Sequence, residues 1–496
     1  MTVFRTAATL FIFSFLGRNM VRAQENDSVI SLSLRNIVDL AITKSSAVKY
    51  AQNQNENAYW RYRNYQARFR PQLTLTGDLP NYTHTTTPVT QPDGSIKFQQ
   101  VSNAQTSANL SLNQSIPQLG TSIYAATSLY RVQDFRNNTT DFSGSPFSVG
   151  FVQPIFSYNW MKWYKKEEPL AYEQATKDYV QSIEEIALNA TRKFFSYLKI
   201  QTNYNLAENN LKNSEDNLKI AEMKKKLGRI SENDYSRIKL SVFNARKSLN
   251  RARMNLKNAD FDLKSYTGID QSENIDLEMP LNITLFNIDK EKALEEAKSN
   301  RKEMPRFKRR LIEADRQLAQ AKSNNGLGLT LRGSYGVSNS ADRLIGVYDH
   351  PEQENLLQLS VSIPILDWGK SASEVKLAES KRELEIFDVN RDMENFVRKV
   401  GVQVEQFKLL KDQLTTAREA DKVAGNGYKI ALKKFQNGEI SITDLNISLS
   451  ERESAKRDYI DSLRDYWEAY YNLRILTLYD FENNQKITYK NPLLTN

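Results

Sequence analysis

The sequence predicts an internally duplicated α+β fold in which pairs of β-strands lead into very long helical hairpins. The main observation is a phrase that occurs twice, Gly-Arg-Ile-Ser-Glu-Asn-Asp at 228–234 and Gly-Glu-Ile-Ser-Ile-Thr-Asp at 438–444, an offset of 210 residues (438 minus 228). Pro154 and Pro364 have the same offset, and each ends a strand-like run just before a long helix begins. An internal repeat decides the architecture before any local feature does, so a strand-to-helix unit has been duplicated.

The N-terminus is typical of a cleaved secretory signal. Arg5 precedes an apolar run from Ala7 to Leu16, and small residues ending at Ala23 precede Gln24, the expected first residue of the mature chain. The apolar run is shorter than the ~20 residues of a membrane-spanning helix, so an uncleaved anchor is the less favoured alternative. Because the chain has no cysteine, disulfides, a thiolate nucleophile and an acylated lipobox are all excluded.

Charge indicates solvated surfaces rather than a nucleic-acid partner. The formal net charge is +9, and the Lys and Glu residues are intermixed along the chain. A nucleic-acid interface would instead gather Lys and Arg in one stripe with aromatic residues between them.

The repeat boundaries follow from two different offsets. We expect a signal peptide at 1–23, a first repeat at 24–268, a linker at 269–289, a second repeat at 290–479 and a C-terminal tail at 480–496. The opening helix of each repeat, about 34–69 and about 290–324, aligns at an offset of 256 (297 minus 41). Since 256 minus 210 is 46, the first repeat holds 46 extra residues between its two strands. They form either an extra hairpin or a structured surface loop.

Strand signals follow each opening helix. Apolar residues alternate with polar ones around 73–77, 147–153, 329–332 and 357–363. Alternation of this kind suits both a membrane barrel strand of ~9 to 11 residues and a half-buried strand of a soluble protein. Within the extra residues, 108–112 and 122–125 are also strand-like.

Each proline is followed by a polar helix of unusual length, about 168–226 and about 371–436, on the order of 90 to 100 Å at ~1.5 Å per residue. The return helices, about 231–267 and 441–476, carry heptad seams typical of left-handed coiled coils. The seam residues are Val242, Ala245, Leu249, Ala252, Leu256, Ala259 and Leu263 in the first copy, and Ala455, Tyr459, Ser462, Tyr466, Ala469 and Leu473 in the second. The other faces are Lys, Glu, Asn and Gln, so a wall of such hairpins could enclose a wet lumen.

With these elements in this order, the chain resembles the outer-membrane efflux protein family, the TolC-like channels, across nearly its whole mature length. The residues that carry the resemblance are Ser-Ile-Pro-Ile-Leu-Asp-Trp-Gly-Lys at 362–370, the two Gly-x-Ile-Ser-x-x-Asp tips, and Asn-Arg-Lys-Glu-Met-Pro at 300–305. The resemblance implies an α+β membrane channel, in which a transmembrane β-barrel built from several chains continues into a long α-helical coiled-coil barrel. In the family three chains each give four strands to one 12-stranded barrel. Some oligomer is required, because the unpaired backbone N–H and C=O groups of an open sheet edge cannot face lipid.

The implied function is that of the outer-membrane channel in a tripartite efflux or type I secretion system. Such a homotrimer is a passive export duct across outer membrane and periplasm, in contact with outer-membrane lipid. A periplasmic adaptor and an inner-membrane pump are its implied partners, with no cofactor and no nucleic acid.

The tips where the long helices reverse are the predicted gate and adaptor-docking site. They comprise Gly228, Ile230, Ser231, Asp234, Phe435, Gly438, Ile440, Ser441, Asp444 and Ile447. Local structure explains part of this set: glycine tolerates the positive φ of a helix end, serine caps the returning helix, and aspartate favours its positive start. Both this local role and an adaptor contact stay open.

The resemblance also places gating carboxylates at Asp234 and Asp444, where symmetry would form an acidic, cation-binding constriction. The match is incomplete, since the family's second carboxylate falls on Ile447 and a gating arginine falls on Ile440. We therefore expect closure to rely more on apolar contact that involves these two isoleucines and Phe435.

Aromatic residues gather at the strand-to-helix passages, which are marked by Pro154, Pro364 and Gly369. The set is Phe156, Tyr158, Trp160, Trp163 and Trp368. Tryptophan and tyrosine favour the membrane interface, which predicts a periplasmic-side belt, and ordinary packing at the barrel base is the alternative.

Two other classes of function are less favoured. An enzyme is not expected, because the only histidines are His84 and His350 in polar segments, which supports neither a metal cluster nor a Ser/His pair, and no phosphate loop follows a strand. A structural coiled-coil spacer of the envelope, or an adhesin stalk without transport, would explain the heptads. It leaves the strands and interface aromatics without a purpose.

Overall fold

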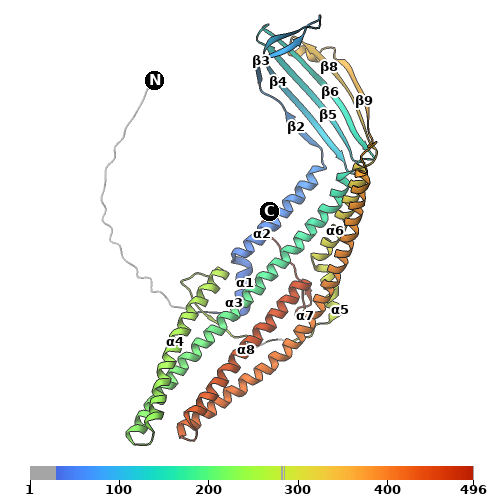
Figure 1. Cartoon of the computed structure of the whole chain (residues 1–496). Helices are drawn as coiled ribbons and strands as arrows, with labels where there is room; N and C mark the ends of the chain where they lie inside the picture. Colours follow the sequence, from blue (N-terminus) through green and yellow to red (C-terminus); the bar gives the residue numbers. More distant parts are fainter. Residues whose placement is uncertain (1–28, 281–282, 284, 495–496) are drawn as a thin grey trace, which may run out of the picture.

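The computed structural model describes residues 29–280, 283 and 285–494; the expected signal peptide at 1–23 lies outside this part of the chain. The molecule is elongated, with a twisted β-sheet at one end and two helical hairpin tips at the other (Figure 1). A bundle of helices connects the two ends. None of the described helices is both long and apolar enough to cross a membrane.

The opening segment of each repeat consists of two helices, not the single helix that was expected. The first repeat has α1 (Leu34–Lys44) and α2 (Ser46–Arg68), and the second has α5 (Lys290–Asn300) and α6 (Glu303–Asn324). The breaks fall at Ser45 and Arg301, which keep the offset of 256 and share an extended backbone conformation. The Ser45 hydroxyl accepts a hydrogen bond from the Val48 amide at 3.2 Å and so starts α2. The duplication therefore includes the break itself.

The long helices lie close to the expected positions. They are α3 (Trp160–Lys226), α4 (Glu232–Thr267), α7 (Lys370–Asn437) and α8 (Ile442–Thr477). Only α3 begins clearly earlier than predicted, because it continues through Pro169 and packs its first turns on α2, with the Tyr65 and Tyr164 rings 5.4 Å apart. All seam positions of α4 are buried or half-buried, and most of the residues between them are exposed, which confirms the heptad prediction.

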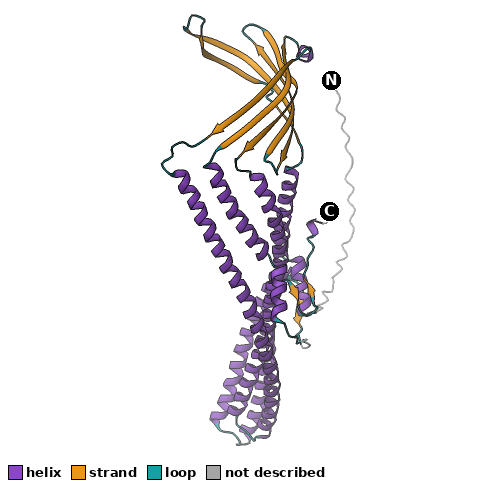
Figure 2. Ribbon diagram, turned by 90° about the vertical axis from the view of Figure 1, so that its right-hand side faces the viewer, coloured by secondary structure: helices purple, strands orange, loops and turns teal. Residues whose placement is uncertain are grey.

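The helices form a single curved row. Near the sheet the order is α2, α3, α6, α7, and near the tips it is α4, α3, α8, α7 (Figures 1 and 2). Thus α3 and α7 run along the whole length of the row. Beside them, α2 near the sheet gives way to α4 near the tips, and α6 gives way to α8. Ion pairs join neighbours in the row, for example Arg192 with Glu468 at 2.8 Å between α3 and α8.

The core lies midway along the row, where α1, α3, α5 and α8 meet. Its fully buried side chains include Ile37, Phe194, Phe195, Leu263, Phe407, Leu463, Tyr466 and Leu473. Beside it β1 (Val29–Leu32) pairs in parallel with β7 (Asn274–Leu277), which lies inside the segment expected to be a linker. Two further short strands, β10 (Tyr479–Asp480) and β11 (Gln485–Lys486), hold the C-terminal tail against the core.

The sheet at the far end has seven strands. They are β2 (Gln72–Thr76), β3 (Asn81–Thr90), β4 (Ile96–Ile116), β5 (Thr121–Asp134), β6 (Thr139–Ile155), β8 (Gly328–Ala341) and β9 (Glu352–Ser362). Their order is β2-β4-β5-β6-β8-β9, all antiparallel, with β3 beside the upper part of β4. The 46 extra residues thus form an extra hairpin within the sheet, which holds more strands than the four per chain that the family resemblance implies for the barrel.

Candidate functional site

The sheet has one apolar and one polar face, because register and strand alternation bring like residues into common rows. In one row Leu112, Ala125, Val149 and Tyr335 are cross-strand partners. The next row, formed by Ser111, Ala126, Ser148 and Gly336, points to the opposite face. The apolar face further contains Leu73, Leu75, Leu110, Ile123, Phe151, Leu329, Leu331, Leu357, Leu359 and Val361; the polar face contains Thr74, Asn109, Asn113, Ser122, Arg332, Ser334, Gln358 and Ser360.

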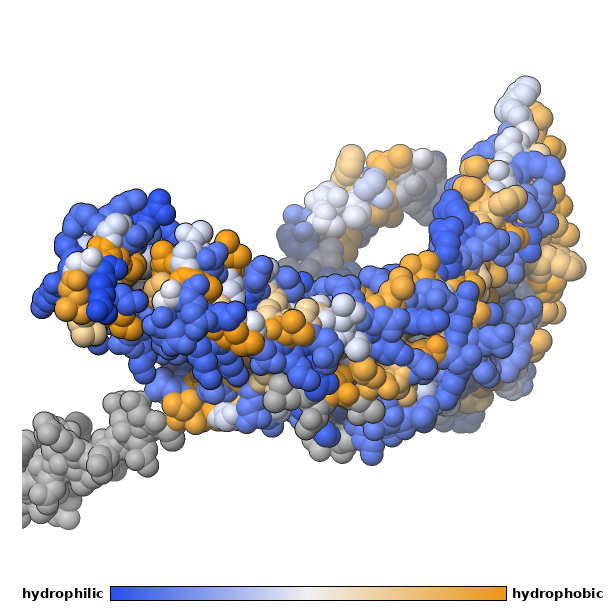
Figure 3. Space-filling view, turned by 90° about the horizontal axis from the view of Figure 1, so that it is seen from below, coloured by the Kyte–Doolittle hydropathy of each residue, from blue (hydrophilic) through white to orange (hydrophobic). Residues whose placement is uncertain are grey.

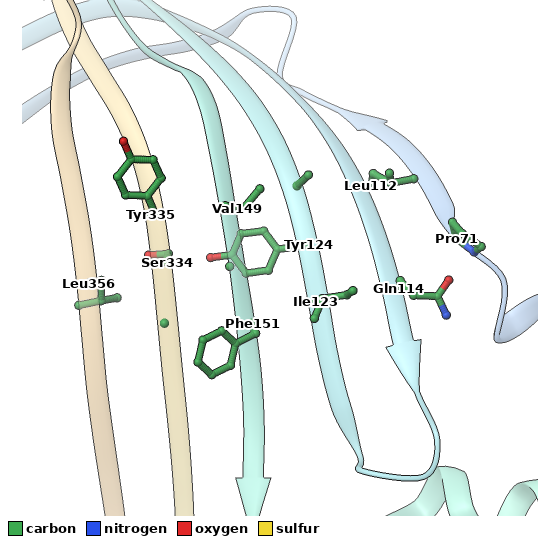
Figure 4. A pocket seen from close by; sticks show the side chains of 13 residues that line it. Pro71, Leu112, Gln114, Ile123, Tyr124, Val149, Phe151, Ser334, Tyr335 and Leu356 are labelled. Carbon is green, nitrogen blue, oxygen red and sulfur yellow. The ribbon is translucent and has the colours of Figure 1, made fainter.

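A cavity of about 770 Å³ follows the curvature of the sheet, lined by residues of β4, β5, β6, β8 and β9 (Figure 4). Two aromatic side chains cover glycines of the next strand, Tyr124 on the polar face and Phe151 on the apolar face. A Cβ atom on Gly150 would lie 2.5 Å from the Tyr124 ring, and one on Gly333 would lie 2.6 Å from the Phe151 ring. The lining contains no charged side chain, so this cavity is a depression in a curved wall and offers no catalytic group.

The strand-to-helix passages use backbone conformations that differ between the copies. Pro154 is the partner of Thr330 inside the sheet, close to the end of β6. In the second copy Pro364 follows β9, and the chain then enters α7 through Trp368 and Gly369 with φ of 55° and 85°. The Asp367 carboxylate accepts hydrogen bonds from the amides of Gly369 and Ser371 at 3.1 and 2.9 Å, which fixes the start of the helix.

The predicted belt aromatics lie at the junction of sheet and helices. Phe156, Trp160 and Trp368 are exposed, the last to 90%, whereas Tyr158 and Trp163 are half-buried. Sequence reasoning missed Ile365 and Leu366, which stand exposed beside Trp368. Their signal was the apolar pair between Pro364 and Asp367, which a soluble loop would not need to expose. The belt itself stays a prediction.

Both tips end their outbound helix in a Schellman motif. The Gly228 amide donates to the Lys225 carbonyl at 3.0 Å, and the Arg229 amide donates to Lys224 at 2.8 Å. At the second tip the Glu439 amide donates to the Lys434 carbonyl at 2.9 Å. The glycines have φ of 65° and 84°, so their local role is confirmed.

Serine and aspartate at each tip form a helix cap. The Asp234 amide donates to the Ser231 hydroxyl at 3.0 Å, and the Asp444 amide donates to the Ser441 hydroxyl at 3.2 Å. The Ser441 hydroxyl and amide in turn donate to the Asp444 carboxylate at 2.7 and 3.0 Å, and these bonds lower the pKa of Asp444. Asp444 therefore keeps its negative charge at neutral pH, while Ile447 is exposed and the side chains of Ile230, Ile440 and Phe435 are half-buried.

A charged cluster near the core was not predicted. The Arg474 guanidinium of α8 donates to the Glu184 carboxylate of α3 at 2.7 and 2.8 Å and to Asp480 at 3.0 Å. Tyr489 of the tail donates to Glu184 at 2.6 Å. Burial alone would lower the pKa of Arg474, but the bonds and charge of Glu184 outweigh it and raise that pKa. The sequence signal was the glutamate pair 184–185 between apolar residues of α3, at 183–188.

The same cluster contains a buried carboxylate with several donors. Burial alone would raise the pKa of Asp480, but hydrogen bonds from Asn483 and Tyr470 and the charge of Arg474 lower it. Among the described residues no group of His, Cys, Asp and Glu has the arrangement of a metal site. The charged side chains near the core therefore act in structure, since each has its own partner.

The model of a protein family described as outer membrane efflux protein matches residues 97–269 and 293–477, which is most of the chain. The chain belongs to the outer membrane efflux protein family. A comparison with curated proteins gave no match.

Solved structures share the fold of this efflux protein. A membrane protein from Pseudomonas aeruginosa is 15% identical, with a TM-score of 0.63 over 93% of this chain and 92% of the other. The CmeC outer membrane channel of Campylobacter jejuni is 15% identical, with a TM-score of 0.61 over 90% and 85%. The outer membrane protein VceC of Vibrio cholerae is 12% identical, with a TM-score of 0.61 over 90% and 95%.

Family and fold together confirm the expected TolC-like class with its mixed α/β content. The family assignment also confirms that the chain is an efflux component of the outer membrane. The family is one of export channels and not of enzymes.

Proposed function

We propose that three copies of this efflux protein close into one tube, which is the passive outer-membrane duct of a tripartite export assembly. The observation that carries the proposal is that both the sheet and the helical row of a single chain have two uncovered lateral edges, along the whole length of the molecule. The sheet ends in β2 and β9, and the helical row ends in α2 and α4 on one side and in α7 on the other. One lateral contact, repeated around an axis, would close both layers.

The sheet edges need partners for reasons of hydrogen bonding. All residues of β2 and all residues of β9 are exposed, and Leu357 of β9 is 78% exposed. In lipid each unpaired backbone amide or carbonyl costs several kcal/mol. Pairing of β9 from one copy with β2 of the next satisfies both edges, and such a head-to-tail contact closes into a ring.

Each of the two helices at the ends of the row near the tips, α4 and α7, has an exposed apolar stripe, separate from the seam inside its own hairpin. On α4 it consists of Leu240, Phe243, Met254 and Phe261, and on α7 of Val402, Leu409, Val423 and Ile430. All eight side chains are exposed, and the α7 residues are spaced by seven or fourteen. Two heptad stripes at the opposite ends of one row fit the seam of a coiled coil between neighbouring copies.

The tips supply the gate and the docking site in this proposal. Both tips lie at the end of the molecule remote from the sheet, where they would meet a periplasmic adaptor and, through it, an inner-membrane pump (Figure 1). Asp234 and Asp444, repeated by threefold symmetry, would form an acidic constriction, and the apolar side chains of Ile440, Ile447 and Phe435 would hold it closed. No cofactor is needed, because the duct is passive and energy enters at the pump.

The test is conductance of the purified full-length oligomer in a planar bilayer. We expect ion-conducting events that are rare in the native protein and frequent in a variant with a loosened tip, Ile440→Ser with Ile447→Ser. A protein without conductance in both forms, extracted from membranes without detergent, would be the structural spacer instead.

A further inference from the structure

We propose that the barrel of this channel contains six strands per chain, so that β4 and β5 are full members of its lipid-facing wall and a trimer encloses eighteen strands. The proposal rests on the proposed trimer and concerns the inserted hairpin in the first repeat. Four observations place the hairpin in the wall and not inside the lumen or above the membrane.

The first observation is a mismatch between neighbouring helices and neighbouring strands. Helix α2 leads into β2, β6 leads into α3, α6 leads into β8, and β9 leads into α7. The adjacent helices α3 and α6 continue as the adjacent strands β6 and β8, and α6 and α7 continue as β8 and β9. Helices α2 and α3 are also adjacent, yet β4 and β5 stand between β2 and β6. The hairpin therefore widens the wall between the two original strands of the first repeat.

The second observation is that the hairpin pairs with a strand of the wall on each of its two sides. Strand β4 pairs with β2 at 109–113 and with β5 along 103–116, and β5 pairs with β6 from Ser122 to Asp134. If the hairpin were a plug or a surface loop, the other strands would pair directly with one another and the wall would be closed without the hairpin. Here its removal would leave the edges of β2 and β6 without hydrogen-bond partners.

The third observation is that the foot of the hairpin is fixed at the level of the strand-to-helix passages. The Asn159 amide group, at the start of α3, donates to the Pro117 carbonyl at 2.8 Å, and that of Gln153 donates to the Leu119 carbonyl at 3.1 Å. On the other side the Gln114 amide group donates to the Phe69 carbonyl at the end of α2, at 2.9 Å. The turn at 117–120 thus reaches as deep as the other strands do.

The fourth observation is that the hairpin continues both faces of the sheet. Leu110, Leu112 and Ile123 extend the apolar face, and Asn113 and Ser122 extend the polar face, on which Tyr124 also lies. Figure 4 shows Leu112, Ile123 and Tyr124 on these two strands. Strands β4 and β5 have 21 and 14 residues, more than the ~9 to 11 that a membrane barrel strand needs. A lumenal plug would have no use for a continuous apolar face.

The consequence is a wide outer-membrane segment. With strands ~4.8 Å apart and tilted by ~40°, a barrel of twelve strands measures about 24 Å between backbones and one of eighteen about 36 Å. Twelve helices, four from each chain, at a spacing of ~9 to 10 Å form a ring of about 35 Å. Sheet and helical tunnel would then have nearly equal circumferences. Size selection would occur at the tips, because the barrel no longer narrows the path.

The absence of native cysteine allows a direct test with single-cysteine variants of the full chain in proteoliposomes. The variants are Leu112→Cys and Asn113→Cys on β4, Ile123→Cys and Ser122→Cys on β5, and, as controls, Leu357→Cys and Gln358→Cys on β9. Each carries a bimane label, and quenching by spin-labelled lipid is compared with quenching by a water-soluble quencher. We expect lipid quenching to be severalfold stronger at the leucine and isoleucine positions than at their polar neighbours on all three strands.

Alternation on β9 together with its absence on β4 and β5 would overturn the six-strand wall and leave the proposed channel intact. Loss of alternation on β9 as well would overturn the membrane barrel itself, and the six-strand wall with it. A second measurement needs no cysteine. Neutral polymers with a radius of ~10 Å, added on the barrel side of the tip-loosened channel, enter a lumen of eighteen strands and reduce its conductance, whereas a barrel of twelve strands excludes them.

Discussion

At the scale of single residues, the middle of the molecule depends on the cluster of Glu184, Arg474, Asp480 and Tyr489. Glu184 is 0% exposed and accepts hydrogen bonds from both Arg474 and Tyr489. A buried carboxylate is tolerated only with such partners, because its desolvation is costly. The cluster joins α3, α8 and the C-terminal tail at the point where α3 exchanges α2 for α4 as its neighbour.

We expect Arg474→Ala to destabilise the protein by about 3 to 5 kcal/mol, since it leaves the Glu184 charge buried and unpaired. Thermal loss of the oligomer measures the effect. The matched control is Arg246→Ala, whose ion pair with Glu215 lies at the surface and should contribute less than about 1 kcal/mol. Equal losses for the two arginines would contradict the structural role of the cluster.

A second residue-scale prediction separates the two roles of the tip carboxylate. Asp444→Asn and Asp444→Ala remove the charge, so we expect the cation-to-anion permeability ratio to fall by about twofold or more. Ser441→Ala leaves the charge and removes the cap, which should cost about 1 kcal/mol of helix stability without a change in selectivity. Ion selectivity measured in planar bilayers distinguishes the role of the charge from the role of the cap. If all three variants kept the native selectivity, the acidic ring would be absent.

At the scale of elements, the periodic features could be predicted from the sequence. The heptad seam of α4, the tip glycines and the serine caps all follow from local patterns, and the structure confirms them. The break at Ser45 also has a local signal, because this serine caps α2. The break at Arg301 could not be predicted, because contacts with other side chains and with α8 fix the turn. Arg301 shows this, since its guanidinium reaches both Glu303 and the Ile475 carbonyl.

The inserted strands show a different limit. The offsets of 256 and 210 located the extra residues, and alternation at 108–112 and 122–125 marked strands within them. Whether those strands enter the sheet depends on partners distant in sequence, such as Gly150 beneath the Tyr124 ring. Local alternation contains no such information, so it could not show that the sheet holds more strands than the resemblance implied.

The apolar stripes at the two ends of the helical row give an element-scale prediction. We expect Leu409→Lys with Val423→Lys to dissociate the oligomer into monomers, because the charges would be buried in the seam between copies. Leu409→Met with Val423→Ile, which keeps the stripe apolar, is the control and should leave the oligomer intact. Native mass and circular dichroism measure assembly and helix content. An oligomer that survives the first pair of changes would place the contact between copies elsewhere.

At the scale of the whole molecule, duplication explains why one chain can supply both layers of a tube. Each repeat brings strands and a helical hairpin in the same order, so the sheet and the helical row open toward the same two sides (Figure 2). The hydropathy of the surface agrees with this arrangement. Seen from the tip end, apolar patches are interspersed with hydrophilic surface on the helical part and do not form one large apolar face (Figure 3).

We propose that a single chain is one third of a continuous tube from the outer surface to the periplasmic tips. Single-particle imaging of the detergent-extracted full-length protein, viewed along its long axis, tests it most directly. A trimeric tube would appear as a threefold ring around an open lumen, with each β9 paired to the β2 of the next copy and each α7 packed on the next α4. A solid helical rod without a lumen, or a particle whose sheet edges stay open, would contradict it.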